Sequence, residues 1–573
     1  MKENLKSNDE EQYEQFETSD KEDSNPQKRK KNTKSFLHPK TIIKTLLLTV
    51  SFICLLIIIF QYFESINKIS ETYKPSKEEN PAKKPLLETK KCDPGYKFVG
   101  DKCEINHSIR AEYHTTEDNQ RIKIISLIPS IPMEMIIDGE SVSPIKEYTF
   151  PKKGNHTVYI LSDFKKLTTA KRMFYQIKNM HYIAFTQLFD TRNILEMNAM
   201  FYECVTLTSI DLSYFNTEKV KNMELMFAGC HHLASIDLSH FNTKSVTSFA
   251  NMFEDCLSLT VINLSNFDTS QTKDLSFMFF GCASLTSIDV THFITDEVTS
   301  MEYMFKGCTS LTSIDLSNFN TENVSSLSRM FERCTSLISL DLSNFDTRKA
   351  TSISSMFFDC YNLQNVNLKS FNTENVIAMN GLFHDCHSLT SIDINHFDTR
   401  NVVNMNLMFN GCTSLTSIDL SNFNTDSLEY IDNIFNGCSS LQAIDITHFK
   451  TNKVTSMISL FQGCESLTSI DVSNFNTEQV TNMKHMFYEC KSLTSIDLSN
   501  FVVDEVRRIE YMFYQCNNLQ YIDISPFHFE NLKIVSLFNN LPDKGSIRIR
   551  KNLYNRIKED IPEEWEVSIL DLS

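Results

Sequence analysis

The chain has 573 residues, 16 cysteines and a formal net charge of −17 at neutral pH. The first 44 residues carry ten Lys or Arg and nine Asp or Glu, so the rest of the chain carries a net charge of about −18. A surface this acidic argues against nucleic acid and against anionic lipid as partners, because both repel negative charge.

The N-terminal part of the chain predicts a membrane anchor. Residues 1–44 are polar and are predicted to be a disordered cytosolic tail. Residues 45–63 carry no charge, and at about 1.5 Å per residue they are long enough to cross the core of a bilayer. Because Lys and Arg precede this stretch, we expect a retained type II signal-anchor with everything after Glu64 outside the cell. The sequence thus predicts a single-pass plasma-membrane protein with extracellular repeats.

Two segments separate the anchor from the repeats. Residues 64–91 are rich in Lys, Glu and Pro and are predicted to be a stalk. Residues 92–165 contain short apolar runs between Gly and Pro turns, which predicts a small all-β, sandwich-like domain. Cys92 and Cys103 flank such a turn, so we predict that they form a disulfide in an oxidising compartment. Candidate N-glycosylation sequons lie at Asn106, Asn155, Asn263 and Asn323.

The rest of the chain is dominated by one unit copied in series. Thirteen cysteines, from Cys204 to Cys516, are spaced 26 residues apart without insertion or deletion. A fixed period of this length is typical of a solenoid, in which each unit buries its apolar face against its neighbours. We predict an N-terminal cap with a degenerate repeat over residues 166–203, a solenoid over residues 204–541 and a C-terminal cap over residues 542–573.

Each unit contains a strand motif such as LTSIDLSNF, residues 311–319, with the apolar spacing of a leucine-rich repeat. Ile314 and Leu316 are two residues apart and share one face of a short strand, whereas Asp315 points to the other face. From Val324 onwards the apolar residues follow a helical spacing, which predicts a short helix. The predicted fold class is therefore an α/β repeat solenoid, with a parallel β ladder and short helices, preceded by a transmembrane helix and the small all-β domain.

Two phenylalanine positions and the cysteine position recur in all thirteen units. All three fall on the inward phase of the unit, so we expect them to pack in the core and not to line a ligand groove. The cysteines are predicted to be buried, reduced thiols, because the repeats contain no Cys-x-x-Cys pair and no His at ligand spacing. Disulfides between neighbouring units are the alternative, and they require Cα separations below about 7 Å.

The outward side of the strands is the candidate binding face. The position between the two apolar strand residues is acidic in eleven units, whereas Asn263 and Asn367 occupy it in the other two. We call these acidic residues the Asp column: Asp211, Asp237, Asp289, Asp315, Asp341, Asp393, Asp419, Asp445, Asp471, Asp497 and Asp523. Two interpretations stay open, namely hydrogen bonding to neighbouring Ser and Thr, or an acidic face for a basic protein partner. Divalent cations are a more weakly supported ligand for the same face.

No chemistry-bearing set interrupts the period. An active site added to a repeat protein should interrupt the regular spacing. No set of nucleophile, general base or metal ligands does so here, and we therefore predict a protein without catalytic residues, cofactor or metal site. Four histidines occupy the slot just before the turn Phe, where other units have Asn, and the closest pair is two units apart. That separation is about 10 Å on the strand spacing, too far for one metal ion, so we expect them to be surface substitutes for Asn.

The unit LTSIDLSNFNT joined to VTSMEYMFKGC resembles the repeat of the BspA-like leucine-rich-repeat surface proteins and is similar to repeats of mycoplasma surface lipoproteins. The resemblance covers roughly residues 178–543, and the ending IPEEWEV is similar to the way such arrays close. It implies surface exposure, adhesion to host cells or extracellular matrix, and no catalytic residues. The internal signal-anchor departs from the bacterial members, which carry a lipobox or a sorting signal.

The sequence therefore leaves three functions to consider. The first is adhesion to a host cell or to matrix, and the second is a receptor or coat component whose partner belongs to the same cell. The third is a secretory-pathway enzyme on a type II anchor, which the uninterrupted period disfavours.

Overall fold

The computed structural model describes residues 96–99, 102–105, 107–527 and 533–570. The predicted tail, signal-anchor and stalk, together with Cys92, lie outside these residues. Within the described part of the chain, no helix combines the length and the apolar character that a membrane crossing needs.

Antiparallel strands come first in the described chain. They are β1 (Tyr96–Val99), β2 (Lys102–Ile105), β3 (Ile109–Thr115), β4 (Gln120–Lys123), β5 (Met133–Ile137), β6 (Glu140–Val142), β7 (Glu147–Phe150), β8 (Gly154–Ser162) and β9 (Met180–Phe185), with a short 3-10 helix η2 (Phe164–Lys166). β3 pairs antiparallel with both β8 and β9, and β5 pairs antiparallel with β8 and β6.

These strands do not form the separate all-β domain that the sequence predicts. β9 also pairs in parallel with β10 (Ser209–Asp211), which is the first strand of the repeats, so one six-stranded sheet runs in the order β10-β9-β3-β8-β5-β6. Buried side chains of β3 and β8, such as Ile109 and Val158, belong to the same hydrophobic core as those of the repeats. The N-terminal strands are thus built onto the end of the solenoid and share its core.

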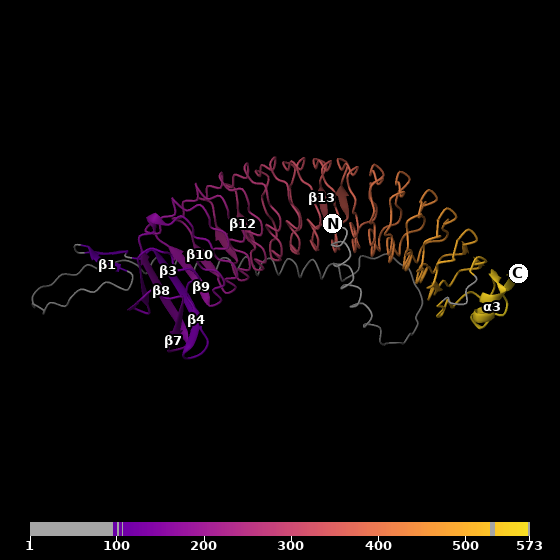
Figure 1. Cartoon of the computed structure of the whole chain (residues 1–573), viewed down its shortest axis with the longest axis horizontal. Helices are drawn as coiled ribbons and strands as arrows, with labels where there is room; N and C mark the ends of the chain where they lie inside the picture. Colours follow the sequence, from indigo (N-terminus) through magenta and orange to yellow (C-terminus); the bar gives the residue numbers. More distant parts are fainter. Residues whose placement is uncertain (1–95, 100–101, 106, 528–532, 571–573) are drawn as a thin grey trace, which may run out of the picture. The chain divides into compact units, whose positions relative to one another are not determined.

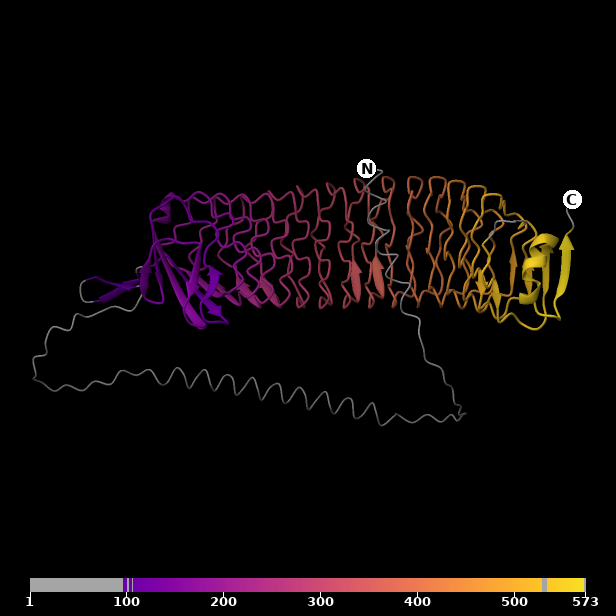
Figure 2. The same cartoon turned by 60° about the horizontal axis from the view of Figure 1, so that its bottom comes forward.

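The repeats form a parallel β-solenoid, one coil for each 26-residue unit, and Figures 1 and 2 show the coils stacked one behind another. Three-residue strands occur at equivalent positions of several coils: β11 (Ser235–Asp237), β12 (Val261–Asn263), β13 (Ser339–Asp341), β14 (Asn365–Asn367), β15 (Ser495–Asp497) and β17 (Tyr521–Asp523). Neighbouring strands pair in parallel and in register, so that Asp237 lies opposite Asn263. In the coil described above, Leu316 is buried and Asp315 is exposed, as the period-2 pattern predicts.

The predicted short helices are absent. Between residues 167 and 527, where the description is continuous, the structure contains no α-helix. Val324 and the apolar residues that follow are buried, but they lie on consecutive tight turns in which every second N–H bonds three residues back, as Met330 does to the carbonyl of Leu327. The left-handed residues Arg329 and Arg333, with φ of 59° and 61°, interrupt any helix. A chain of three-residue turns buries nearly the same positions as a helix of 3.6 residues per turn, which explains the error.

The remaining N–H groups of these turns bond to the next coil. Phe331 donates to the carbonyl of Met356 at 3.0 Å, and Arg333 donates to the carbonyl of Phe358 at 2.7 Å. Single parallel bridges also connect neighbouring coils, as between Ser326 and Ser352. The side that the sequence assigns to helices is therefore a second ladder of hydrogen bonds between coils, which satisfies the buried backbone groups.

A third ladder consists of buried threonines. In eleven coils the hydroxyl donates to a carbonyl of the next coil at 2.7–3.0 Å: Thr191, Thr217, Thr243, Thr269, Thr295, Thr321, Thr347, Thr373, Thr399, Thr451 and Thr477. Each hydroxyl thus ties its own coil to the next one.

The core contains one continuous stack of phenylalanine rings. Neighbouring rings lie 5.5–6.0 Å apart and within 17° of parallel from Phe174 through Phe331 to Phe538. Every ring is nearly inaccessible to solvent. The structure therefore places the first phenylalanine series in the core, as the sequence predicts, and the same is true of the second series, in which Phe345 and Phe371 stack at 6.4 Å.

The C-terminal end of the solenoid is covered by further strands and the one α-helix of the described residues. They are β16 (Phe513–Tyr514), β18 (Phe538–Asn539), β19 (Ser546–Arg550), α3 (Lys551–Ile557), a 3-10 helix η3 (Lys558–Asp560) and β20 (Glu566–Leu570). β19 pairs in parallel with β17 and with β20. Trp565 is buried and donates from Nε1 to the carbonyl of Pro542 at 2.8 Å. This segment pairs with the last strand of the coils, which leaves that sheet edge unexposed.

The thirteen cysteines of the period are free, buried thiols. Each Sγ donates to a phenylalanine carbonyl of a preceding coil, as Cys334 does to Phe305 at 3.2 Å. Burial raises the pKa of the Cys204 and Cys308 thiols to about 12. The ladder is thus protonated at neutral pH and unreactive, because the thiolate is the nucleophile.

We expect the native chain at pH 8 to leave these thirteen cysteines unmodified by iodoacetamide, because the thiols are neither accessible nor ionised. After unfolding in guanidinium chloride, all thirteen should be alkylated. Peptide mass spectrometry of the two samples measures the difference. Rapid alkylation of the thirteen cysteines in the native chain would contradict their burial.

Candidate functional site

Ten of the eleven carboxylates of the Asp column are exposed on one side of the coils, and Asp523 is the exception. In nine of these ten the Oδ1 atom accepts a hydrogen bond from the backbone N–H two residues ahead at 2.9–3.1 Å: Asp211, Asp237, Asp289, Asp315, Asp341, Asp419, Asp445, Asp471 and Asp497. Asn263 accepts the equivalent bond through its own Oδ1. The position therefore has a structural role in the turn after the strand, and both Asp and Asn can fill it.

In seven of these residues, hydrogen bonds to the carboxylate lower its pKa and so favour the ionised form. A backbone N–H is the main cause of a lowered pKa in four members, namely Asp237, Asp315, Asp341 and Asp419. A neighbouring hydroxyl is the main cause in three others, namely Asp289, Asp445 and Asp471. In Asp289, for example, Thr291 donates its hydroxyl at 2.7 Å. The same carboxylates thus bond to neighbouring Ser and Thr residues and remain exposed, so the two interpretations of the column are compatible and the protein partner stays a prediction.

Asp523 does not belong to the exposed face. Its side chain is buried, and Arg548 lies opposite it on the paired strand β19, with Nη1 at 3.4 Å from Oδ2. The sequence predicts an outward carboxylate at this position because the period continues to it. The C-terminal strand covers the last coil, however, so the exposed column ends at Asp497.

The lowered pKa values predict an acid dependence of stability. The pKa of Asp in an unfolded chain is about 3.9. An Asp whose pKa is lower than this in the folded state stabilises the fold above that pH, and the contribution is lost as the pH falls through the folded-state pKa. We expect the melting temperature of the natural chain to decrease as the pH is lowered below about 4. In a variant in which the seven Asp residues with lowered pKa become Asn, this decrease should be smaller. Asn keeps the acceptor oxygen but does not titrate. Melting curves by circular dichroism from pH 7 to pH 2.5 test this, and equal slopes in both proteins would contradict it.

The structure describes three of the four predicted glycosylation sites. Asn155 and Asn263 are exposed, whereas Asn323 is half-buried and donates from Nδ2 to the carbonyl of Asp296 at 2.7 Å. The same nitrogen would carry a glycan, so Asn323 is the less suitable acceptor. Asn106 and the Cys92–Cys103 pair lie outside the residues whose side chains the structure describes.

Four histidines stand in the slot before the turn phenylalanine: His240, His292, His396 and His448. In the first three, Nε2 lies 2.7–3.0 Å from a leucine carbonyl of the preceding coil. Asn344 donates to Leu316 in the same way, at 2.9 Å. The interpretation of these histidines as substitutes for Asn is therefore supported for these three.

The turns just before the ladder cysteines have a feature that was not predicted from the sequence. The residue just before each ladder cysteine has a positive φ, and we call these positions the left-handed edge. Six of the thirteen are glycine, with φ of 68–76°: Gly229, Gly281, Gly307, Gly411, Gly437 and Gly463. The rest carry a side chain at φ of 52–61°. Non-glycine residues in this conformation are uncommon, so the choice of side chain along this edge calls for a reason.

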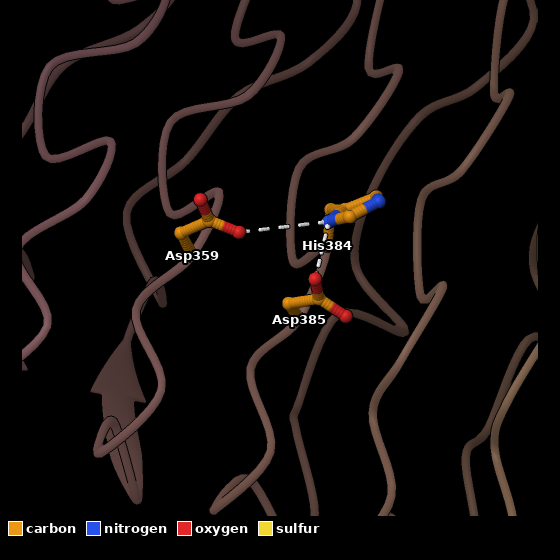
Figure 3. A group of neighbouring side chains, drawn as sticks. All are labelled: Asp359, His384 and Asp385. Atoms are coloured by element: carbon orange, nitrogen blue, oxygen red, sulfur yellow. Dashed lines mark ion pairs between the residues drawn. The ribbon is translucent and has the colours of Figure 1, made fainter. Parts of the chain in front are cut away.

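Two consecutive coils place Asp359 and Asp385 at this edge, and His384 lies between them (Figure 3). The Nδ1 atom of His384 is 3.4 Å from Oδ2 of Asp385 and 4.0 Å from Oδ1 of Asp359. One donor atom from each of the three residues lies within 4.8 Å of the other two. The arrangement joins neighbouring coils through side chains that do not follow the repeat, and we call it the His384 cluster.

The two carboxylates are held at their far oxygens. Arg333 places Nε at 3.3 Å from Oδ2 of Asp359, and His387 places Nε2 at 3.4 Å from Oδ1 of Asp385. Burial raises the pKa of Asp359, to which the charge of Asp385 adds, and burial lowers the pKa of His384. Both pKa directions have partial burial of the cluster as their main cause.

A signal for the His384 cluster was present in the sequence. The segments FFDCYN and FHDCHS have Asp where six units have glycine, and the second segment adds two histidines three residues apart. These substitutions were overlooked because the 26-residue spacing is unbroken in both units. Which side chains of neighbouring coils meet depends on how the coils are stacked, which the spacing alone does not give.

The repeats match one protein family. Four overlapping segments, residues 168–287, 258–367, 338–444 and 430–543, match the family described as "Mycoplasma protein of unknown function, DUF285". No curated protein matches the chain. Together the four segments span about two thirds of the chain.

Two solved structures are also similar at low identity. One is a leucine-rich-repeat protein of Leptospira interrogans, with 14% identity and a TM-score of 0.19, covering 71% of this chain and 94% of that one. The other is the pneumococcal vaccine antigen PcpA, with 13% identity and a TM-score of 0.20, covering 64% of this chain and 78% of that one. Similarity at this level supports no statement about function. The 26-residue coils and the four matched segments identify the chain as a member of the DUF285 repeat family.

Proposed function

We propose that this chain is a non-catalytic surface protein whose solenoid binds other proteins, and that its function is adhesion to host cells or extracellular matrix. The single observation that carries the proposal is the exposed part of the Asp column. Nine carboxylates accept a hydrogen bond from their own backbone and occupy the same position in nine of the coils. A rigid row of anions costs little entropy to order on binding.

The chemistry of this face selects the partner. Carboxylates that stay ionised favour a protein with a basic patch, and the charge attracts it over a distance comparable to the Debye length of about 8 Å. A repeated, nearly identical face also suits several weak contacts that act together. Divalent cations remain a second and weaker ligand class for this face, because a single exposed carboxylate per coil offers few donor atoms.

The BspA-like resemblance and the membrane anchor belong to the same proposal. The resemblance supports adhesion, and residues 45–63 would anchor the chain as a single-pass type II protein with its repeats outside the cell. Neither an enzymatic activity nor a resident cofactor is part of the proposal, because no nucleophile and general base are brought together at the Asp column.

Binding of the full-length chain on beads tests this function. We expect binding to host cells or matrix proteins that weakens with salt and is lost when Asp289, Asp315, Asp341 and Asp393 are all changed to Asn. The matched control removes four exposed charges from another edge by changing Glu218, Glu322, Glu374 and Glu478 to Gln. Equal binding by both variants and the natural chain would refute the Asp column as the docking face.

The second candidate function is a receptor or coat component with a partner on its own cell. The same beads separate the two, because binding to cells of the chain's own kind in preference to host cells or matrix supports the second candidate. Proteolysis of intact cells tests the location independently: it should remove the repeats and spare the N-terminal tail.

A further inference from the structure

The structure assigns a divalent transition-metal site, with Zn²⁺ as the best-fitting ion, to Asp359, His384 and Asp385. This site is separate from the Asp column, which lies at the strand side of the coils. Its donors are one imidazole nitrogen and two carboxylate oxygens that converge from two neighbouring coils (Figure 3).

The first argument is the unused nitrogen of His384. Nδ1 is buried and has no hydrogen-bond partner among the described residues, although Oδ2 of Asp385 lies only 3.4 Å away. The ring is held in place by Phe358, which stacks on it with the centroids 4.0 Å apart and the planes within 8°. A buried nitrogen without a partner is costly, and a ligand that it could bind would remove the cost.

The second argument is the spacing of the donors. Bonds from Zn²⁺ to nitrogen or oxygen are about 2.0–2.2 Å, so donors around a tetrahedral ion lie roughly 3.3–3.6 Å apart. His384 and Asp385 already have this spacing at 3.4 Å, and the 4.0 Å between His384 and Asp359 needs an adjustment of about half an ångström. Two of the three donor separations are therefore at or near the tetrahedral value, and all three lie within 4.8 Å.

The third argument is the way the carboxylates are oriented. Arg333 and His387 contact the far oxygen of Asp359 and of Asp385, respectively, so that in each case the other oxygen faces Nδ1 of His384. Outer partners of this kind orient metal ligands in proteins. Both Asp residues also hold a left-handed conformation, with φ of 59° and 53°, in slots where glycine is the commonest residue.

The donor set selects the class of metal. Ca²⁺ and Mg²⁺ prefer oxygen donors alone, whereas an imidazole with two carboxylates suits Zn²⁺ and its neighbours in the transition series. Three protein donors leave a fourth position for water or for a side chain of another protein. The side chains of His384 and Asp385 keep 16% and 29% of their surface exposed, although Nδ1 itself is buried. The ion would also join two coils, as the threonine ladder does elsewhere.

Equilibrium binding of Zn²⁺ to the full-length, metal-stripped chain tests the assignment. We expect the natural chain to bind one more equivalent of Zn²⁺ than the His384→Gln or Asp385→Asn variant. In each variant the affinity of this site for Zn²⁺ should fall by more than the roughly 10–100-fold that removal of an outer partner of a metal ligand costs. The matched control is Asp255→Asn, because Asp255 occupies the same left-handed slot at φ 52° but has Glu254 in place of the histidine. Circular dichroism checks that each variant is folded.

A second pair of variants leaves all three donors in place. A methyl group on Gly411 would collide with Oδ1 of Asp385, and a methyl group on Gly281 would collide in the same way with Oδ1 of Asp255. Both glycines have nearly the same φ, +72° and +69°, so their alanine variants carry the same backbone strain. We expect Gly411→Ala to weaken Zn²⁺ binding and Gly281→Ala to leave it unchanged.

Co²⁺ provides a spectroscopic readout of the same site. Visible absorption bands of bound Co²⁺ should appear in the natural chain and be absent in His384→Gln. Zn²⁺ binding that is as tight in His384→Gln as in the natural chain, or that falls equally in Asp255→Asn, would overturn the assignment.

Discussion

Replacing Phe331 by alanine should lower the free energy of unfolding by about 3–5 kcal/mol, the usual cost of removing a fully buried aromatic ring. Phe331 is inaccessible to solvent and lies between Phe305 and Phe357 in the stack, at 5.7 and 6.0 Å. The coils around it are held by hydrogen bonds to their neighbours, so they cannot collapse to fill the cavity. Urea denaturation followed by circular dichroism measures the loss.

Phe280→Ala is the matched control for this prediction. Phe280 is half-buried at the edge of the coil and packs on Phe277, so its removal opens no closed cavity and should cost clearly less. Hydrogen exchange should also rise mainly in the coils next to residue 331, because each repeat contacts only its neighbours. Equal costs for the two variants would show that the stack contributes nothing beyond ordinary surface packing.

Replacing Thr295 by valine should lower the free energy of unfolding by roughly 2–6 kcal/mol. The buried hydroxyl of Thr295 donates to the carbonyl of Asn320 at 2.9 Å and accepts from the backbone N–H of the same residue at 2.7 Å. Valine has almost the same shape but offers no partner, and each buried backbone group left unsatisfied costs about 1–3 kcal/mol.

Thr295→Ser separates this effect from packing, because serine keeps the hydroxyl and loses only a methyl group. We expect the serine variant to retain most of the stability that the valine variant loses. If the valine variant proved the more stable of the two in urea denaturation, the threonine ladder would be a packing feature and not a hydrogen-bonding one.

The inward positions of the coil could be predicted from the sequence. Leu316, Val324, Phe331 and Cys334 were all expected in the core, and all are buried. Burial follows from the spacing of apolar residues, because those residues leave water whatever the local backbone does. The local backbone conformation could not be predicted in the same way, and turns of three residues replace the predicted helix. The spacing of apolar residues does not distinguish a helix from such turns, because both bury nearly the same positions.

The candidate sites show the same division at the level of single residues. The outward direction of Asp315 was predictable from alternation along a strand, and the burial of Asp523 was not, since it depends on the strand β19 that covers the last coil. The His384 cluster was missed for a related reason. Asp359 and His384 are 25 residues apart, and only the stacking of coils brings them within 4.0 Å.

The sequence by itself determined the repeat unit of 26 residues, the side chains that form the core and the row of acidic residues on the strands. Only the tertiary structure decided that backbone and threonine hydrogen bonds run between coils and which polar side chains of neighbouring coils meet. The physical reason is that burial is a property of each residue in its own coil, whereas a hydrogen bond or an ion pair needs two atoms within about 3–4 Å. That distance is set by the stacking of one coil on the next.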